Sequence, residues 1–352
     1  MKTIVAVVLG SMLMLTQSSV FATTITGPVV QYEGCDGVTA AVAINDEMFV
    51  VASPNDNVLR VYARTGSVKP LVSFDLSDYL EVSPGLPSLI QGATRVGDRV
   101  YWITSHGRDE EGRIRPERYR FFATTMVNEG GQIEIQPVGR PAKALVHRLV
   151  DRHTMRTLRL DKATRFGLEL KEEERRRLAP SRGGLNIAAL CASHNAEILM
   201  ALRNPRPLRV ITGTPHALIV PLDNADEVIE KGEDPIFGEG ILLDLAGRGI
   251  AGFEYSEFHA AYFFVAPPPD TESDFVLYRW SGMKANPPKV VECFSTDSQD
   301  FFPDTVVPFE HANELLLLGH GVIGPRAGES ALHESDTGSL VTRSFRGCWL
   351  RP

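Results

Sequence analysis

One pattern of predicted β-strands recurs five times along the chain, and this repeat constrains the fold more than any other feature. Each copy opens with a strand of small residues, passes through a polar turn into a strongly apolar strand, and then adds further strands. In the first copy the turn is Asn45-Asp46 and the apolar strand is 48–52. The predicted strands of the five copies are 37–42, 48–52, 58–63 and 71–74; 92–96, 100–104, 119–125 and 133–138; 187–191, 198–202, 216–222 and 241–245; 250–253, 261–266, 275–280 and 290–294; and 305–309, 315–318 and 340–345.

The repeat predicts an all-β fold, a β-propeller of five four-stranded blades. The second strand of each copy is apolar at nearly every position, as expected for a strand covered on both faces. An isolated unit cannot bury both faces, whereas five units stacked around an axis can. The fifth copy ends before a fourth strand, and the spare N-terminal segment 28–32 can complete it, which closes the ring and removes exposed sheet edges. A large β-sandwich is the alternative fold.

The segment 141–180 interrupts the repeat and predicts a helical insertion. Residues 172–174 are all Glu and 175–177 are all Arg, so acids precede bases at spacings that stabilise a solvent-exposed helix through ion pairs. By chain order the segment joins the outer strand of the second copy to the inner strand of the third. It lies on the face that usually carries the ligand site of a propeller, as a lid or as a charged surface insertion.

The first 22 residues have the pattern of a secretory signal peptide. Lys2 is followed by an apolar run over 3–16, and Val20-Phe21-Ala22 fits a cleavage site. The run is shorter than the roughly 20 residues that span a bilayer, which favours cleavage over a retained membrane anchor. We therefore predict one mature domain over 23–352, periplasmic or secreted, with no membrane span after signal cleavage.

Four cysteines follow the signal segment: Cys35, Cys191, Cys293 and Cys348. An oxidising compartment favours one or two disulfides among them. Four cysteines allow three pairings, and the sequence does not choose between these. Cys191 lies in an apolar strand and is equally well explained as a small buried side chain.

Loops that follow the second strands are rich in cations and predict an anion-binding funnel. Guanidinium groups grip phosphate or carboxylate through paired donors. The candidate ligand-binding residues are His106, Arg108, Arg113, Arg115, Arg203, Arg206 and His320. In the alternative interpretation these arginines pair with acids such as Asp109, Glu110, Glu111 and Asp270 and only hold the loops.

Acidic residues near the predicted axis suggest a Ca²⁺ site, since this cation takes oxygen ligands. The candidates are Asp36, Asp300 and Asp304. No loop has an EF-hand pattern, and Asp residues in loops commonly serve as turn formers. A chain with no cofactor is therefore the main expectation.

No catalytic motif identifies an enzyme. The run Gly319-His-Gly-Val-Ile-Gly324 matches G-x-G-x-x-G, but Pro325 follows and no helix is predicted, so we reject a dinucleotide site. There is no G-x-S-x-G elbow, P-loop or H-E-x-x-H motif. His106 and His320 are general acid or base candidates, or structural loop histidines.

Several phrases together resemble an uncharacterised bacterial family, domain of unknown function 3616. They are Ser105-His-Gly-Arg108, Phe121-Phe-Ala123, Gly184-Leu-Asn-Ile187, Leu202-Arg-Asn-Pro205, Ala217-Leu-Ile-Val-Pro-Leu222 and Leu277-Tyr-Arg-Trp280. The resemblance spans Asp36 to Gly321 and implies a propeller-like β fold and an exported protein. The chain is more distantly similar to secreted phytase-like esterase propellers, in which an acidic residue begins the inner strand. Gln91 and Ala188 hold those places here, which disfavours a metal-dependent hydrolase.

Two functions remain open at this point. The first is an exported propeller that binds a small anionic molecule or a partner protein on its loop-bearing face. The second is a phosphoester or carboxylic-ester hydrolase whose arginines clamp the substrate. The formal net charge of −8 argues against a nucleic-acid partner.

Overall fold

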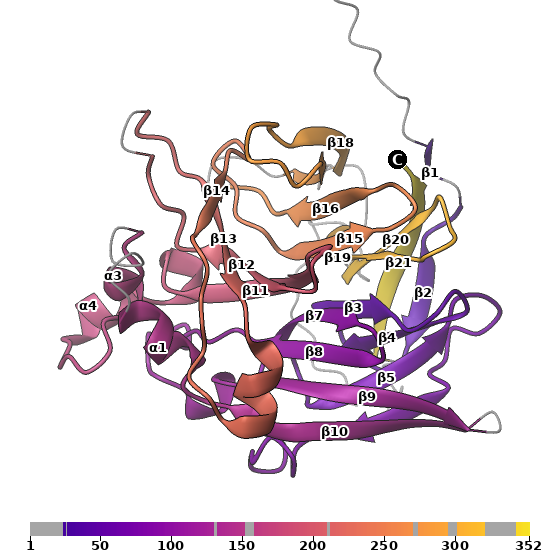
Figure 1. The fold of residues 1–352 in the computed structure, drawn as a ribbon, viewed down its shortest axis with the longest axis horizontal. Coiled ribbons are helices and arrows are strands. Elements are labelled where there is room, and N and C mark those ends of the chain that lie inside the picture. Colours follow the sequence, from indigo (N-terminus) through magenta and orange to yellow (C-terminus); the bar gives the residue numbers. More distant parts are fainter. Residues whose placement is uncertain are drawn as a thin grey trace, which may run out of the picture.

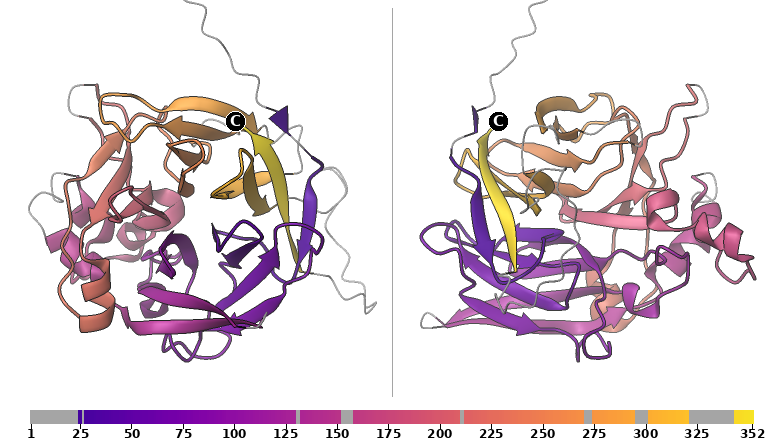
Figure 2. Two further views of the ribbon diagram at one scale, coloured as in Figure 1. Left: turned by 45° about the vertical axis from the view of Figure 1, so that its right-hand side comes forward. Right: turned by 180° about the vertical axis from the view of Figure 1, so that it is seen from behind.

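The computed structural model describes residues 24–25, 27–129, 132–151, 158–209, 212–269, 274–294, 301–320 and 343–352. Five antiparallel sheets stand as blades around a central axis, as Figure 2 shows on its left. The innermost strands contact one another in a closed circle, β3 with β7, β7 with β11, β11 with β15, β15 with β19, and β19 with β3. The five-bladed β-propeller predicted from the repeat is confirmed.

Strands follow one another in sequence order across each of the first four blades (Figure 1). The first blade contains β3 (Ala40–Ala43), β4 (Met48–Ala52), β5 (Val58–Ala63) and β6 (Val72–Asp75). The second contains β7 (Ile90–Val96), β8 (Arg99–Thr104), β9 (Phe121–Glu129) and β10 (Gln132–Ala142). The third contains β11 (Asn186–Ala192), β12 (Ile198–Asn204), β13 (Ala217–Leu222) and β14 (Ile241–Leu243). The fourth contains β15 (Gly252–Ser256), β16 (Ala261–Ala266), β17 (Phe275–Trp280) and β18 (Lys289–Phe294).

The fifth blade joins the two ends of the chain. It contains β19 (Phe302–Pro308), β20 (Leu315–His320) and β21 (Ser344–Arg351), and β2 (Val30–Glu33) completes it from the N-terminal side. β2 runs antiparallel to β21, with Val30 opposite Gly347 and Glu33 opposite Ser344. The two-residue strand β1 (Thr24–Ile25) pairs with the far end of β21. The predicted closure of the ring by an N-terminal strand is confirmed.

The predicted third strand of the fifth copy, 340–345, ended too early, since β21 continues to Arg351. Residues 340–342 of that prediction lie outside the described part of the chain. β21 supplies Phe345, Cys348 and Leu350, which are all buried. These side chains continue the blade interfaces beyond the predicted end of the strand.

The core lies between neighbouring blades. The second strands are almost wholly buried, as predicted for strands covered on both faces. Between the first and fifth blades, for example, Tyr32, Phe49 and Phe345 pack with Leu316 and Leu318. Each such side chain contributes roughly 1.5–3 kcal/mol when fully buried, so the blade interfaces dominate stability.

Small residues let the inner strands approach one another near the axis. A Cβ atom on Gly92 would lie 2.7 Å from the backbone of Ala189 and Leu190 in the next blade. A Cβ on Gly252 would lie 2.6 Å from the Cα of Thr305. The small-residue strand that opens each copy therefore reflects close contact between blades at the centre of the ring.

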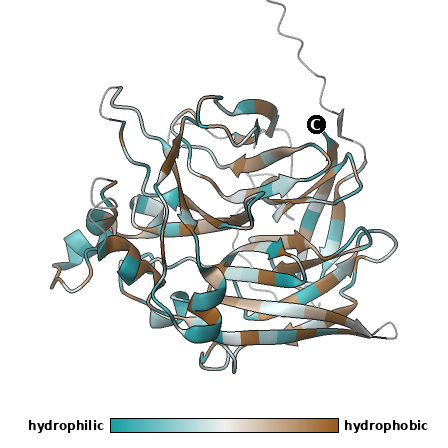
Figure 3. Cartoon of the chain, in the orientation of Figure 1, coloured by the Kyte–Doolittle hydropathy of each residue, from teal (hydrophilic) through white to brown (hydrophobic). Residues whose placement is uncertain are grey.

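The predicted helical insertion is present and leaves the ring on one side (Figure 1). It contains α1 (Leu145–Asp151), α3 (Leu160–Thr164), α4 (Glu172–Arg176) and the 3₁₀ turn η2 (Pro180–Arg182), with 152–157 outside the described residues. α1 buries Leu145, Val146 and Leu149 in a cluster shared by the second and third blades. α4 has no buried residue, is hydrophilic in Figure 3, and carries an ion pair between Glu172 and Arg176.

Two further short elements lie in connections between strands. The 3₁₀ turn η1 (Pro116–Arg118) precedes β9, and η3 (Glu227–Lys231) is a turn of π-helix that packs against β10. Arg99 forms ion pairs with Asp226 and with Glu230 at 2.6 Å, and so ties the second blade to this connection.

The cysteines do not form disulfides. Cys35, Cys191 and Cys348 are buried, whereas Cys293 is exposed. The disulfide interpretation is therefore corrected, and for Cys191 the alternative of a small buried side chain holds. Burial raises the pKa of its thiol well above the usual value.

The proposed signal peptide, residues 1–22, lies outside the described residues. In the part of the chain that is described, no helix has the length and apolar character needed to cross a membrane.

Candidate functional site

The direction of the strands places the loops at two opposite ends of the propeller. We call the end with the connections between blades the loop face; its described segments include 34–39, 76–89, 105–120, 143–151, 158–185, 205–209 and 244–251. The other end, with the tight turns after the inner strands, is the turn face; its turns are 44–47, 97–98, 193–197, 257–260 and 309–314. All seven candidate ligand-binding residues lie on the loop face or at a strand end that opens onto it.

His106 is buried inside the loop face and does not line a described cavity. Its backbone has a φ of 49°, and its Nδ1–H donates to the carbonyl of Thr104 at 3.0 Å. Burial lowers the pKa of His106 to about 4, so the ring is neutral at pH 7. Its Nε2 is buried with no hydrogen-bond partner among the described residues.

Arg108 joins its own loop to the helical insertion. Its guanidinium donates to the carbonyl of Gly112 at 3.0 Å and to that of Thr164, at the end of α3, at 2.8 Å. Burial lowers the pKa of Arg108, which marks it as a desolvated cation held by backbone carbonyls. These contacts give Arg108 a structural role, because they connect its loop to α3.

Arg113 and Arg115 also have partners within their own loop. Arg113 forms ion pairs with Asp109 at 3.2 Å and Glu111 at 3.1 Å, and Arg115 pairs with Glu117 at 2.8 Å. Such contacts are those expected if the arginines hold the loop. Neither residue lines the described cavity on this face.

Arg203 and Arg206 line a cavity of about 350 Å³ between the third and fourth blades, which we call the arginine cleft. Its other walls are Glu110, Pro180, Ser181, Asn186, Asn204, Gly249, Pro267 and Pro268. The chain crosses tightly here, since a Cβ on Gly249 would lie 2.1 Å from the carbonyl oxygen of Arg203. The Asn204 amide donates to the carbonyl of Pro180 at 3.0 Å and so fixes the insertion against β12.

The arginine cleft combines available donors with an unpartnered acceptor. The exposed guanidinium of Arg203 forms no hydrogen bond or ion pair with a described residue, whereas Arg206 donates to the carbonyl of Gly247 at 2.7 Å. Asn186 Oδ1 is buried without a partner among the described residues. Glu110, the acid in the cleft, accepts a hydrogen bond from the Ser181 hydroxyl. The cleft can therefore hold a ligand that has both an anionic group and a hydrogen-bond donor.

His320 lies close to this arginine. Its Nδ1 is 2.6 Å from Asp304 Oδ2, and this hydrogen bond raises the pKa of His320, whereas the nearby charge of Arg203 lowers it. Asp304 occupies an irregularity in the pairing of β19 with β20. Of the predicted residues, Arg203 and Arg206 thus line one cavity, and His320 lies outside its lining but within range of the charge of Arg203. Arg108, Arg113 and Arg115 are held by other partners.

The acidic candidates are dispersed in the described structure. Asp36 lies 3.6 Å from Arg343, and Asp304 is engaged by His320. Asp300 falls outside the described residues, as do 321–324 of the G-x-G-x-x-G match. Among the residues that are described, no three His, Cys, Asp or Glu side chains gather in a way that could hold a metal ion.

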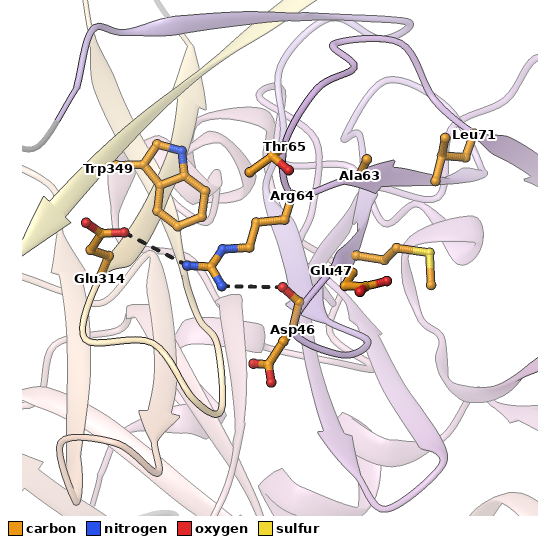
Figure 4. Close-up of a pocket in the computed structure, with 9 residues that line it drawn as sticks. Asp46, Glu47, Ala63, Arg64, Thr65, Leu71, Glu314 and Trp349 are labelled. Carbon is orange, nitrogen blue, oxygen red and sulfur yellow. Dashed lines mark hydrogen bonds and ion pairs between the residues drawn. The ribbon is translucent and has the colours of Figure 1, made fainter.

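A cavity of about 700 Å³ on the turn face contains a clamp between the first and fifth blades (Figure 4). The guanidinium of Arg64 lies 4.6 Å from the ring centre of Phe309 and 5.1 Å from that of Trp349. It also donates to the carbonyl of Asp46 at 3.3 Å and lies 3.9 Å from Glu314. Arg64 therefore connects the first and fifth blades beside this cavity.

The sequence interpretation missed Glu254, the buried carboxyl group of the inner strand β15. It lines an axial cavity that opens on the turn face. The sequence did contain a sign of this group. Glu254 stands between the aromatic residues Phe253 and Tyr255, and a Glu side chain is rarely buried unless it has a partner.

No protein-family model and no curated protein sequence matches this chain. Solved structures with a similar fold include the β-propeller domain of Cps50 (Swd1) from Myceliophteria thermophila, 7% identical, covering 93% of this chain and 99% of that one, with a TM-score of 0.37. An exo-β-1,3-galactanase from Phanerochaete chrysosporium is 10% identical over 69% of this chain and 46% of that one, with a TM-score of 0.35.

The extracellular domain of a protein from B. thetaiotaomicron that is assigned as a hybrid two-component system is 9% identical, with a TM-score of 0.32. That match covers 81% of this chain and 32% of the chain of that extracellular domain. At these identities and scores the likenesses say nothing about the activity of this chain.

Proposed function

We propose that the protein is an exported β-propeller that binds a small anionic molecule in the arginine cleft. The observation that carries the proposal is the guanidinium of Arg203, which faces a cavity and has no ion-pair partner among the described residues. A carboxylate or phosphate group can pair with this guanidinium in two parallel hydrogen bonds. Arg206 retains donors beyond the one that holds Gly247.

The cleft favours a hydroxylated anion over a plain one. Asn186 Oδ1 needs a donor, and a ligand hydroxyl supplies one. A phosphorylated sugar or a hydroxy acid carries both groups. The signal-peptide pattern of residues 1–22 supports export. As a further part of the proposal, the sequence segments that resemble domain of unknown function 3616 support membership of that family.

Thermal shift and titration calorimetry test this function with inorganic phosphate, glucose 6-phosphate, a nucleotide and citrate. We expect stabilisation by at least one hydroxylated anion and a loss of affinity of about tenfold or more in Arg203→Gln, since a charge-assisted pair contributes about 1.5–3 kcal/mol. Arg113→Gln is the matched control, because Arg113 is paired within its own loop. The proposal fails if no anion binds, or if both variants bind as well as the unaltered chain.

The Asp304–His320 pair favours hydrolysis of a phosphoester or carboxylic ester as a second candidate function. In such a reaction His320 Nε2 takes a proton from water, the water oxygen attacks the ester, and the imidazolium returns the proton to the leaving alcohol. Asp304 holds the opposite nitrogen, and Arg203 can pair with the developing negative charge.

Hydrolysis of p-nitrophenyl phosphate and p-nitrophenyl acetate, with and without added Ca²⁺, separates the two functions. Turnover that disappears in His320→Gln, with anion binding retained, supports the hydrolase. Flat progress curves under every condition leave a binding protein.

A further inference from the structure

All five blades contribute to a cavity of about 470 Å³ at the turn face, which we call the axial pocket. Each innermost strand supplies at least one wall residue: Ala43, Arg95, Ala192, Glu254 and Pro308. The pocket therefore exists only because the ring closes. It lies at the opposite end of the propeller from the arginine cleft, so a ligand in the axial pocket is independent of the function proposed for that cleft.

Glu254 brings a half-satisfied carboxyl group to this pocket. Its side chain is only 7% exposed. Oε1 accepts hydrogen bonds from the Thr94 hydroxyl and from the backbone N–H of Tyr255, both at 3.2 Å. Oε2 is buried and has no partner among the described residues. A buried oxygen without a hydrogen-bond partner destabilises the folded state. A ligand that donates a hydrogen bond to Oε2 removes this penalty, which favours its binding.

The charges at the mouth of the pocket favour a positive ligand. Glu257 and Glu310 line the pocket from the turns after β15 and β19. Arg95 is the arginine among the lining residues, and its Nε donates to the carbonyl of Gly97 at 2.7 Å. Tyr255 and Phe309 add aromatic faces, which attract cations. Because aromatic rings also pack against alkyl groups, an organic cation suits this wall better than a metal ion.

We infer that the axial pocket binds a small organic cation with a primary ammonium group, for which Glu254 is the counter-ion. The ammonium donates to Oε2 from inside the pocket. Glu257 and Glu310 attract the cation at the entrance. Its short alkyl body lies against the aromatic rings and the small residues of the inner strands.

This mode of binding releases a proton. Burial raises the pKa of Glu254 to about 8, so the group is protonated in the empty protein at pH 7 and becomes a carboxylate when the ammonium arrives. The other titratable groups around it are Cys191 on β11, Arg95 on β7, Tyr255 on β15, and His194, Glu257 and Glu310 on the adjoining turns. Burial keeps Cys191 a neutral thiol, so Glu254 itself carries the linked proton.

Titration calorimetry of the full chain with n-butylamine, which is charged at pH 7, tests the inference. Repeating the titration in buffers of different ionisation enthalpy counts the protons released. We expect close to one proton released at pH 7 and an affinity that weakens by up to about tenfold for each pH unit below 8. Butan-1-ol, the uncharged analogue, should bind much more weakly.

Glu254→Gln should lower the affinity for n-butylamine by at least about tenfold and abolish proton release. Glu47→Gln is the control, because Glu47 is exposed on the turn face outside the axial pocket. Absence of binding by the unaltered chain, binding without proton release, or equal binding of butan-1-ol would each overturn the inference. These three readouts use the native sequence and so do not depend on whether a variant folds.

Discussion

The hydroxyl of Thr94 in the second blade donates a hydrogen bond of 3.2 Å to the carboxyl group of Glu254 in the fourth blade. The same hydroxyl accepts a bond of 2.7 Å from the backbone N–H of Ala192 in the third blade. Three inner strands therefore meet through one threonine near the axis. This arrangement holds the Glu254 side chain in place while leaving one of its oxygens for a ligand.

Glu254 should make the stability of the protein depend on pH. Its folded pKa of about 8 lies above the ordinary value of 4.5, so the folded state retains a proton that the unfolded state has lost. The free energy of unfolding should therefore fall as pH rises from 4.5 to 8, by at most about 1.4 kcal/mol per unit from this group. Urea unfolding across this range measures the slope.

Glu254→Gln should flatten that slope and raise stability at pH 8, because the amide cannot ionise. Glu257→Gln, at the exposed mouth of the pocket, should leave the slope almost unchanged. A slope equal in the unaltered chain and in Glu254→Gln would show that other groups carry the pH dependence.

Removing the Tyr32 ring should weaken ring closure. Tyr32 lies in β2, stacks on Phe345 at 5.0 Å between ring centres, and meets Phe49 and Tyr62 edge-on. Tyr32→Ala should cost about 3–5 kcal/mol, the usual range for a buried aromatic ring. Gln31→Ala changes the exposed neighbour on the same strand and should cost little. Equal melting temperatures for the two variants would contradict this account of closure.

Arg108 should hold the helical insertion rather than a ligand. Arg108→Ala leaves the carbonyls of Gly112 and Thr164 without this donor, and it should lower stability by about 2–3 kcal/mol. Limited proteolysis should then cut the segment 143–185 faster. Arg113→Ala, which removes exposed ion pairs that are screened by solvent, should leave stability almost unchanged. Unaltered proteolysis of Arg108→Ala would refute the structural assignment.

Gly92 should accept no larger residue. Its added Cβ would meet the backbone of the third blade at 2.7 Å, and neither backbone segment can move without separating the inner strands. Gly92→Ala should cost about 1–3 kcal/mol through overpacking. Gly27→Ala, at a site with open space, is the matched control, and denaturant unfolding compares the two. A neutral Gly92→Ala would mean that the blades are more loosely packed than described.

Much of the blade structure could be predicted from local patterns. The predicted strands 48–52, 58–63, 261–266 and 275–280 became β4, β5, β16 and β17 with the same bounds. The second strands 48–52 and 261–266 are readable because a strand covered on both faces must be apolar along its whole length. The end of β21 could not be placed this way, since Arg346, Gly347 and Arg351 interrupt the apolar pattern, and the pairing of Phe345 with β2 and of Leu350 with β20 decides the register.

The repeat alone indicated the number of blades, the closure by a segment near the N-terminus and the face on which cations gather, because each depends on order along the chain. The partners of individual charged side chains depended on packing in three dimensions. Arg108 and Arg203 both follow the second strand of a copy, yet Arg108 donates to a carbonyl of the distant helix α3, whereas Arg203 faces a cavity. The Thr94 hydroxyl that bonds one oxygen of Glu254 is 160 residues away in the sequence, and the pocket beside this carboxyl group forms only when five strands close into a ring. Burial and hydrogen bonding are properties of neighbours in space, and local sequence does not specify these neighbours.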